Sequence, residues 1–591
     1  MYIRRFSCLA LAALLMGAPP AAQSEGAKLK ALLDAYFEAS LERDPILATS
    51  IGDDRYNDRF PNSLAPAFRN ESRAFLERWL KALGAIDRDK LSGQDRLSYD
   101  ILKRDLLEGL EGLRFPEHLL PLNQSGSIPT FMAQLGHGQS IQPFRHVKDY
   151  EDWLKRAEAM VVWMDQSILN MREGMAKGVV QPKVVMQKLI PQLEAILVTA
   201  PEKSVFWGPI EAFPKGMSDT DKARLTGAYR QCIAARILPA YARLRDFIRD
   251  VYLPKCRDTV GYGNLPDGQA WYAFQVKSMT TTDLTPAVIH DIGLKEVARI
   301  LGEMEGVRQQ VGYQGDLQAF FQFLNSDPRF YFSKEGDLLQ GHRDLQVRIN
   351  ALLPKLFDIF PKADYEVRPV ESFRAESSAG GSYQPGTADG KRPGVFYVNT
   401  FNLKAQPKFG METLSLHEAS PGHHFQISIA QEVVDLPRFR RFGGYNAFAE
   451  GWALYSESIG KELGLFTDPY QWYGRLADEQ LRAMRLVVDT GLHSKGWTRD
   501  QAIAFMKANS SMAESDVVSE VERYIVWPGQ ALGYKLGQFA IRDLRTEAER
   551  TLGARFDIRA FHRQVLIDGA LPLDVLRTKI REWIATEKAK G

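Results

Sequence analysis

The sequence lacks the motifs of several large enzyme classes and carries little net charge. No serine stands in a G-x-S-x-G pattern, and there is no phosphate-binding P-loop and no dinucleotide fingerprint in a strand–turn–helix setting. The formal net charge of the 591 residues is only +2, so the overall balance gives no reason to expect a nucleic-acid-binding protein. After the N-terminal segment, no stretch is long and apolar enough for a transmembrane helix, which takes about 20 residues.

Cysteine is also scarce, with three residues in the whole chain. Cys8 lies inside the apolar N-terminal segment without a preceding small-residue lipobox, so we do not expect a lipid anchor there. Cys232 and Cys256 would remain after removal of that segment. An oxidising compartment permits a bridge between them, and two buried free thiols are the alternative. Both are far along the chain from the histidine cluster described below, which makes them poor candidates for metal ligands.

The N-terminus has the pattern of an export signal. Arg4 and Arg5 precede a nearly uninterrupted apolar run over residues 6–18, and small residues and prolines follow up to position 24. The apolar run is shorter than the roughly 20 residues that span a bilayer. We therefore predict a signal peptide over residues 1–24 and a mature protein that is periplasmic or secreted, with no stable membrane insertion.

The remaining chain has the composition of a globular protein and is too long for one small core. Its hydrophobic fraction of 45% and charged fraction of 25% are ordinary. Apolar residues recur with helical spacing in many segments, and a turn containing glycine and proline at 261–266 marks a boundary. We predict an N-terminal helical subdomain over 25–260 and a catalytic helical subdomain with a metal site over 261–591.

Residues 363–400 differ from their helical surroundings. The stretch 365–370 looks extended, 377–392 is rich in glycine, serine and proline, and 395–399 is typical of a short strand. The sequence therefore predicts a mainly α fold, a multi-helix two-lobed architecture around a cleft, with a small β element next to the active-site helix. Peptides often bind by adding a strand to the edge of a sheet, so we expect this β element to flank the cleft. The alternative is that it is a plain β-hairpin without a role in binding.

Three of the ten histidines fall between positions 417 and 424, in the segment His-Glu-Ala-Ser-Pro-Gly-His-His. Catalytic zinc takes three protein ligands, often two histidines and one carboxylate, and leaves one position open for water. The metal lowers the pKa of that water towards about 7, and a nearby glutamate can then take its proton. The segment therefore predicts a zinc site, the alternative being a set of polar residues at a helix end.

The spacing of these histidines differs from the usual H-E-x-x-H, in which two imidazoles lie one helical turn apart. On an unbroken helix His424 would lie about 10 Å along the axis from His417, too far for one ion with bonds of about 2 Å to nitrogen. Pro421 and Gly422 can break the helix, with the serine before the proline as the N-cap of a new one. Either His423 or His424 could then return towards His417, and both stay open as the second ligand.

A third ligand is expected on the next helix, predicted to follow Asn446 as its N-cap. Glu450 and Glu457 are seven residues apart and therefore share one face of that helix. Both lie among apolar residues, where an unpaired carboxylate is costly. We predict Glu450 as a metal ligand and Glu457 as a group that orients a histidine ligand. The alternative is that each pairs with an arginine such as Arg441 or Arg485.

These motifs also resemble a known family. The chain is similar to the bacterial family called domain of unknown function 885 at 280–293, 417–424, 450–457, 489–493 and 523–531. Several motifs in the same order make the resemblance specific, and it covers nearly the whole mature chain. Members of that family are predicted zinc peptidases with largely undefined substrates. They are distantly similar to helical gluzincins such as angiotensin-converting enzyme and carboxypeptidase Taq.

The resemblance implies roles at the metal site. Carried over from the gluzincins, His417 is the first zinc ligand, Glu418 the general base and Glu450 the third ligand. His423 lines up best with the histidine that ends the gluzincin motif, and the two-residue insertion leaves His424 as its rival.

Further groups are candidates for stabilising the oxyanion of a tetrahedral intermediate. Tyr524 and His493 resemble by role the late tyrosine and histidine of the gluzincins, and Arg523 is a third candidate or a substrate-binding group. Asp489 precedes His493 by four residues on a predicted helix, so its carboxylate could orient that imidazole.

The sequence thus predicts a zinc-dependent metallopeptidase that cleaves small or unfolded peptides in the cell envelope. One alternative is a metal-dependent amide hydrolase with a non-peptide substrate, for which the same site would serve. Another is a non-catalytic envelope protein with structural zinc, which would not need the base Glu418. The substrate, the choice between endo- and exo-cleavage and the oligomeric state stay open.

Overall fold

The computed structural model describes residues 24–375 and 378–590. These residues form a mainly helical protein with one small three-stranded sheet, which confirms the predicted fold class. The predicted signal peptide lies outside the described residues apart from Ser24, whose side chain accepts a hydrogen bond from the Ala27 N–H and caps the first helix. No helix within the described ranges combines the length and the apolar character needed to cross a membrane.

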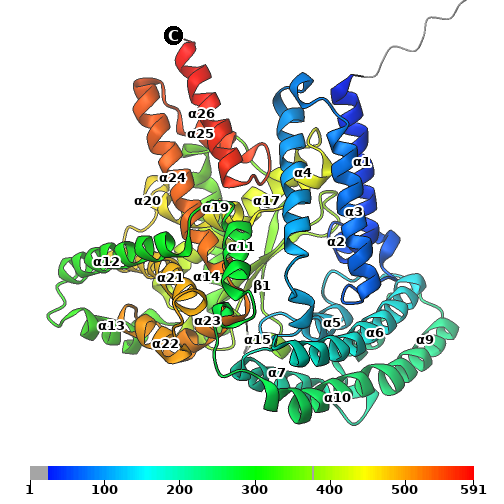
Figure 1. Cartoon of the computed structure of the whole chain (residues 1–591). Coiled ribbons are helices and arrows are strands. Elements are labelled where there is room, and N and C mark those ends of the chain that lie inside the picture. Colours follow the sequence, from blue (N-terminus) through cyan, green and yellow to red (C-terminus); the bar gives the residue numbers. More distant parts are fainter. Residues whose placement is uncertain (1–23, 376–377, 591) are drawn as a thin grey trace, which may run out of the picture.

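The regular elements in the first part of the chain are helices, joined by loops. Helices α1, α3 and α4 pack together as one upright group, and the long helix α6 lies below them with α7, α9 and α10 (Figure 1). The bounds are α1 (Glu25–Arg43), α2 (Pro45–Ser50), α3 (Pro66–Gly84), α4 (Gly93–Gly112), α5 (Ile128–Gly136), α6 (Val147–Lys177), α7 (Lys183–Ile196), α8 (Gly208–Glu211), α9 (Asp219–Cys232), α10 (Leu238–Phe247) and α11 (Gly268–Thr280).

The second part contains the sheet and the helices around the histidine cluster. Its helices are α12 (Pro286–Gln310), α13 (Leu317–Ser326), α14 (Glu335–Leu352), α15 (Ser372–Ala375), α16 (Met411–Glu418), α17 (His423–Glu432), α18 (Arg438–Arg441), α19 (Asn446–Ser458), α20 (Gly460–Leu463), α21 (Pro469–His493), α22 (Arg499–Ala508), α23 (Glu514–Val526), α24 (Gly533–Leu552), α25 (Ile558–Leu566) and α26 (Leu573–Ala589). Its strands are β1 (Tyr365–Pro369), β2 (Gly381–Gln384) and β3 (Gly394–Val398).

The strand order is β1-β3-β2, with β1 parallel and β2 antiparallel to the central strand. One face of the sheet packs through Phe396 and Val398 against a cluster that includes Met411 and Ala419, at the two ends of α16. Strand β2 is an edge strand and contacts α16 directly. The predicted β element therefore lies beside the helix that ends in the histidine cluster.

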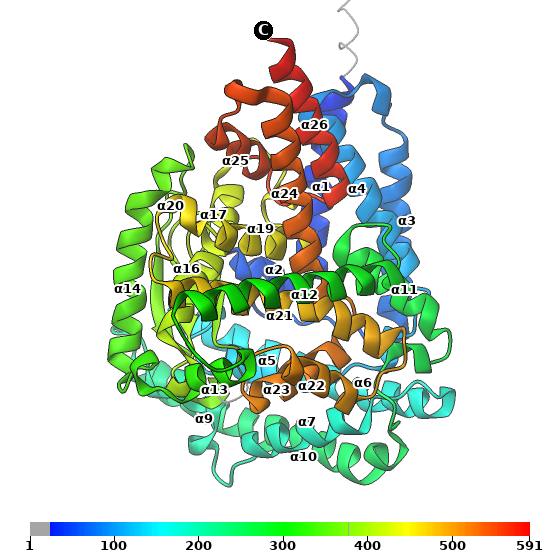
Figure 2. The same ribbon diagram turned by 90° about the vertical axis from the view of Figure 1, so that its left-hand side faces the viewer.

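Two helix pairs hold the centre of the second part. Helix α12 packs along α21 across the molecule, as Figure 2 shows, and α19 packs against α24. Gly451 and Gly537 make the second contact close, because a β-carbon on Gly537 would lie 1.8 Å from the Ala447 carbonyl oxygen. Because both positions are glycine, α24 packs directly against α19, the helix that carries Glu450.

The largest hydrophobic core joins helices from both predicted subdomains. Trp153 on α6 and Tyr241 on α10 belong to the same cluster of buried side chains as Val297 on α12 and Met484 on α21. This core crosses the predicted boundary at residue 260, and the division of the chain into two subdomains stays a prediction. Cys232 is buried and Cys256 half-buried, and both are free thiols, so the bridge that the sequence permitted does not form.

Candidate metal centre

The chain breaks between α16 and α17, as the Pro–Gly pair predicted. Helix α16 ends at Glu418 and α17 begins at His423, with Gly422 in the N-cap position, two residues later than expected. A β-carbon on Gly422 would lie 1.9 Å from the His417 carbonyl oxygen, so only glycine allows the turn to fold back onto the end of α16. This fold-back brings the rings of His417 and His423 to 4.9 Å, nearly perpendicular to each other.

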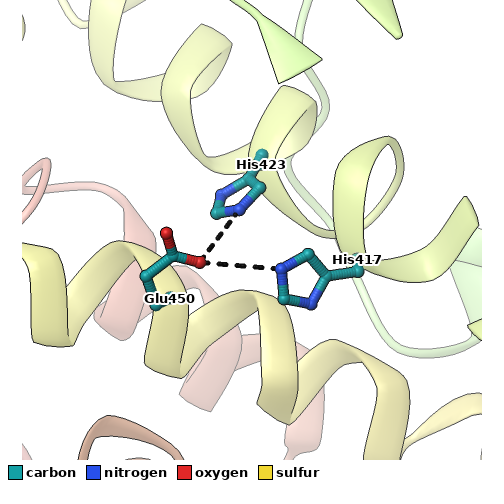
Figure 3. A group of neighbouring side chains, drawn as sticks. All are labelled: His417, His423 and Glu450. Atoms are coloured by element: carbon teal, nitrogen blue, oxygen red, sulfur yellow. Dashed lines mark ion pairs between the residues drawn. The ribbon is translucent and has the colours of Figure 1, made fainter. Parts of the chain in front are cut away.

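His417, His423 and Glu450 form a group whose ligand atoms all lie within 4.8 Å of one another. Glu450 Oε2 lies 3.2 Å from His423 Nε2 and 3.6 Å from His417 Nε2, and the two rings and the carboxylate point towards a common centre (Figure 3). Each side chain comes from a different helix: α16, α17 and α19. The arrangement offers two imidazole nitrogens and one carboxylate oxygen, the donor set of many catalytic zinc sites.

His424 points away from this group. Its Nδ1 lies 2.9 Å from the Tyr383 hydroxyl of β2 and 3.4 Å from the Ser428 hydroxyl, and its ring packs 4.7 Å from that of Tyr365. Burial lowers the pKa of His424 to about 4, which keeps this imidazole neutral against the sheet. Of the two rival histidines, the structure therefore places His423, and not His424, with His417 and Glu450.

Glu457 lies behind His417 on the same face of α19 as Glu450. Its Oε1 is 2.7 Å from His417 Nδ1, and its Oε2 accepts a hydrogen bond of 2.9 Å from the Thr413 hydroxyl. The Glu457 side chain is fully buried. A carboxylate that accepts from Nδ1–H fixes the tautomer in which Nε2 presents its lone pair towards the centre of the group.

The electrostatics of the group favour a cation. Burial would lower the pKa of His417, but its contacts with Glu450 and Glu457 outweigh burial and raise that pKa to about 10. Burial would raise the pKa of Glu450, but the neighbouring charges of His423 and His417 hold it well below the usual range. Oxygen Oε2 of Glu450 is nevertheless buried without a hydrogen-bond partner among the described residues. Both imidazole Nε2 atoms face this oxygen, at 3.2 Å and 3.6 Å, without a regular hydrogen bond. A metal ion in place of the imidazole protons would satisfy all three atoms.

Glu418 is the last residue of α16 and follows the histidine of the group directly. About 9% of its surface is exposed, against 14% and 18% for the side chains of His423 and Glu450, so it is at least as buried as those two members of the group. Its negative charge contributes to the raised pKa of His417.

The predicted pairing of Asp489 with His493 does not occur. His493 Nδ1 accepts from the Tyr262 N–H at 3.0 Å, and its Nε2 lies 2.9 Å from the carbonyl oxygen of Tyr524. Asp489 instead accepts from the hydroxyl of Tyr272 at 2.6 Å and from the N–H of Gly529. Both ring nitrogens of His493 are thus used within the core, which excludes it as a free donor to an oxyanion without rearrangement.

Tyr524 and Arg523 belong to a charged network beside the group. The Tyr524 hydroxyl donates to Glu520 and accepts from Arg485 Nε at 3.1 Å, and only 1% of Tyr524 is exposed. Arg523 donates to Gln530 at 2.6 Å and lies 3.3 Å from Glu520. These contacts occupy the tyrosine hydroxyl that the sequence predicted as a donor to the oxyanion.

Tyr534, which the sequence analysis did not single out, packs closer to the group. Its ring stacks on the His417 ring, with centroids 6.2 Å apart and planes inclined by 15°. Arg523 Nη2 lies 3.4 Å from its hydroxyl oxygen. No local motif marks this tyrosine, because it reaches His417 only through the close packing of α24 on α19.

Comparisons with known proteins support one family and leave its activity open. The sequence profile of the family described as "Bacterial protein of unknown function (DUF885)" matches residues 45–580. A crystal structure from Colwellia psychrerythraea has 30% sequence identity and a TM-score of 0.88, covering 95% of this chain and 100% of that chain. A structure from Shewanella oneidensis has 18% identity and a TM-score of 0.67, covering 94% of this chain and 99% of that chain, which shows similarity of fold alone. Both are described as a "putative lipoprotein". None of the curated proteins matches.

Proposed function

Because the chain belongs to the DUF885 family of bacterial proteins, whose function is unknown, its chemistry has to be argued from the site, and we propose that it is a zinc-dependent hydrolase of peptide bonds. The observation that carries the proposal is the convergence of His417 and His423 on the buried Oε2 atom of Glu450, which makes no hydrogen bond within the part of the chain that the structure describes. A metallopeptidase needs such a three-ligand site with one position left for the reaction.

The residues present fit a zinc ion. Nε2 of His417, Nε2 of His423 and Oε2 of Glu450 would hold it, and they are the three atoms that already face one another. When bound, zinc supplies a Lewis acid that polarises a carbonyl group and lowers the pKa of water to about 7. Glu457 and Thr413 keep His417 in the ligating tautomer through hydrogen bonds that solvent does not reach.

The protein's own groups would handle the proton and the substrate. Glu418 would take a proton from the attacking water and pass it to the leaving amine, because it is the carboxylate that directly follows the ligand His417 at the end of α16. Tyr534 stacks on the same histidine and accepts from Arg523, so its hydroxyl is better placed than that of Tyr524 to donate to a substrate oxygen.

A location in the cell envelope agrees with two observations. The first residues of the sequence have the pattern of an export signal. The relative from Colwellia psychrerythraea, at 30% identity, is described as a "putative lipoprotein", a class of envelope protein. We infer that the substrates are peptides or small amides that occur in that compartment.

The test is metal content, measured by mass spectrometry on the purified protein, its variants and a matched control. We expect about one zinc per chain in the wild type and its loss in His417→Ala, His423→Ala and Glu450→Ala, because three ligands are the minimum of such a site. His424→Ala is the control, since it removes an adjacent imidazole that bonds to Tyr383 instead. No metal in the wild type after supply of zinc, or equal loss in the control, would overturn the proposed site.

The catalytic step has its own test. Glu418→Gln should retain zinc and lose peptide hydrolysis by a factor of about 100 or more, because a general base contributes about 10²–10⁴-fold. Full activity of this variant with zinc bound would show that Glu418 is not the base. Zinc binding without hydrolysis of any peptide or amide in the wild type would favour a non-catalytic zinc protein.

A further inference from the structure

A cavity separate from the proposed metal centre has walls from α12, α19, α20, α21 and α24. Its volume is about 300 Å³, at the lower end of the range of small-molecule sites, about 300–1,000 Å³. His417, His423 and Glu450 are not among the residues that line it. Solvent reaches its rim, because the side chains of Arg299 and Glu303 in the lining are 37% and 40% exposed.

Arginines outnumber carboxylates in the lining of this cavity. The charged lining residues are Arg299, Arg475, Arg542, Arg545, Glu303, Glu462 and Glu549. Arg545 pairs with two of the glutamates, at 2.8 Å each, and Arg299 pairs with the third. All three carboxylates are therefore occupied by two of the arginines, and the other two arginines have no carboxylate partner within the lining.

The charged groups that contact the lining from outside leave this surplus unchanged. Glu296 and Glu479 lie behind the lining, and both pair with the buried Lys535. Lys461 lies beside the lining, with its Nζ 3.4 Å from the centroid of the Trp472 ring. Two carboxylates and two lysines thus join the four arginines and three glutamates of the lining. One positive charge remains when all of these groups are counted, which favours an anion in the cavity.

Two arginines of the lining have N–H groups without an acceptor. Arg475 pairs with Glu479 through Nη1, but its Nε is buried and has no hydrogen-bond partner among the described residues, and only 4% of its side chain is exposed. Arg542 is exposed on α24 and forms no hydrogen bond or ion pair within the part of the chain that the structure describes. A buried donor without an acceptor is costly, and an oxyanion in the cavity would supply the acceptor.

The lining also offers uncharged surface to a ligand. The Trp472 ring lies beside Arg475, whose guanidinium carbon is 5.0 Å from the ring centroid. Thr546 lies one helical turn from Arg542, on the same face of α24. The cavity has the volume of roughly ten water molecules, at about 30 Å³ each. It therefore has room for a small organic molecule attached to the anionic group, and a single ion would not fill it.

We propose that this cavity is a second ligand site, which binds a small organic molecule by its phosphate or carboxylate group through Arg475 and Arg542. Guanidinium groups suit this role, because their paired N–H donors match the geometry of both oxyanions. The site is independent of the proposed hydrolysis, since no member of the metal group lines the cavity. Separate probes distinguish a phosphate from a carboxylate ligand.

The test is calorimetric titration of the full chain, in a buffer without phosphate and at an ionic strength fixed with sodium chloride. The probes are glycerol 3-phosphate, succinate and uncharged glycerol. We expect glycerol 3-phosphate or succinate to bind at one site per chain with a dissociation constant of about 1 mM or lower, and glycerol not to bind. The affinity should be the same with and without added zinc. Absence of binding for both anions, or binding only when zinc is present, would overturn the proposal.

Variants connect this binding to the cavity. Arg542→Gln removes an exposed charge that has no partner, so the fold should be unaffected, and we expect the affinity for the anion to fall at least about 10-fold, because a hydrogen bond to a charged group is lost. Arg475→Lys keeps a charge beside Glu479 but removes Nε and the planar fork, and we expect a similar loss. Arg550→Gln is the matched control, because Arg550 is an exposed arginine of α24 that does not line the cavity. Unchanged affinity in either cavity variant, with the fold verified by circular dichroism, or an equal loss in the control, would contradict the assignment.

Discussion

The substitution Glu457→Gln tests how strongly the carboxylate behind His417 increases the zinc affinity of this proposed ligand. The carboxylate of Glu457 lies 2.7 Å from His417 Nδ1 and accepts a hydrogen bond of 2.9 Å from the Thr413 hydroxyl. Its side chain is fully buried. Glutamine has the same shape, and its carbonyl oxygen can still accept from Nδ1–H. The substitution therefore removes a negative charge while it keeps the orientation of the imidazole.

The expected loss follows from the distance of this charge to the centre of the site. One unit charge about 6 Å from a doubly charged zinc ion interacts with it by roughly 5–6 kcal/mol at an effective dielectric constant of about 20, and this sets an upper limit on the loss. Replacement of outer carboxylates behind metal-bound histidines typically weakens metal affinity by about 10- to 100-fold. The measured range lies below the Coulomb limit, and we therefore expect the dissociation constant for zinc to rise by about 10- to 100-fold.

The assay is zinc competition against a fluorescent chelator at fixed pH, with thermal unfolding of the metal-free forms as a check on folding. Glu462→Gln serves as a control of equal chemistry, because Glu462 lies on the neighbouring α20 and pairs with Arg545. An unchanged zinc affinity in Glu457→Gln, with the fold intact, would refute the argument that this buried carboxylate strengthens the ligand. A complete loss of folding would show that its main role is structural.

Two further predictions concern the backbone and pH. Gly422→Ala should lower zinc stoichiometry and destabilise the protein by about 3 kcal/mol or more, because its β-carbon would lie 1.9 Å from a backbone oxygen of α16. Gly444→Ala, with no atom within 4 Å of the new carbon, should leave both quantities unchanged in metal analysis and thermal unfolding. Burial raises the pKa of Asp489 to about 7 despite hydrogen bonds that lower it, so its contribution to stability is present below about pH 4 and lost as the pH rises to about 7. Asp489→Asn should therefore gain thermal stability relative to the wild type between pH 5 and pH 8, and a constant difference over that range would contradict this reasoning.

The local chemistry of the proposed site could be predicted from the sequence. Segment 417–424 contains three histidines, a glutamate and a Pro–Gly break, and so dense a group of these residue types is typical of a metal site. Helical periodicity placed Glu450 and Glu457 on one face of α19, where they approach His417 from two sides. The mainly α fold with a small β element also followed from local patterns.

Predictions that depended on long-range geometry were less successful. The four-residue spacing of Asp489 and His493 indicated a pair, but tertiary packing gives each of them other partners, Tyr272 and Tyr262 among them. The sequence did not point to Tyr534 near the site, because its neighbours along the chain carry no motif of metal chemistry. It reaches His417 through the contact of α24 with α19, which depends on Gly451 and Gly537, far apart in sequence.

The sequence by itself determined which chemistry is available, because residue type, helical period and a Pro–Gly break are local properties. It did not determine which of two adjacent histidines turns towards His417, since that choice depends on how Gly422 folds back onto α16. Only the tertiary structure gathered Arg482, Arg485 and Arg523 around one tyrosine, because α21, α23 and α24 meet there from distant parts of the chain. The contacts among these side chains arise only where the three helices meet, and no single segment of the sequence carries them.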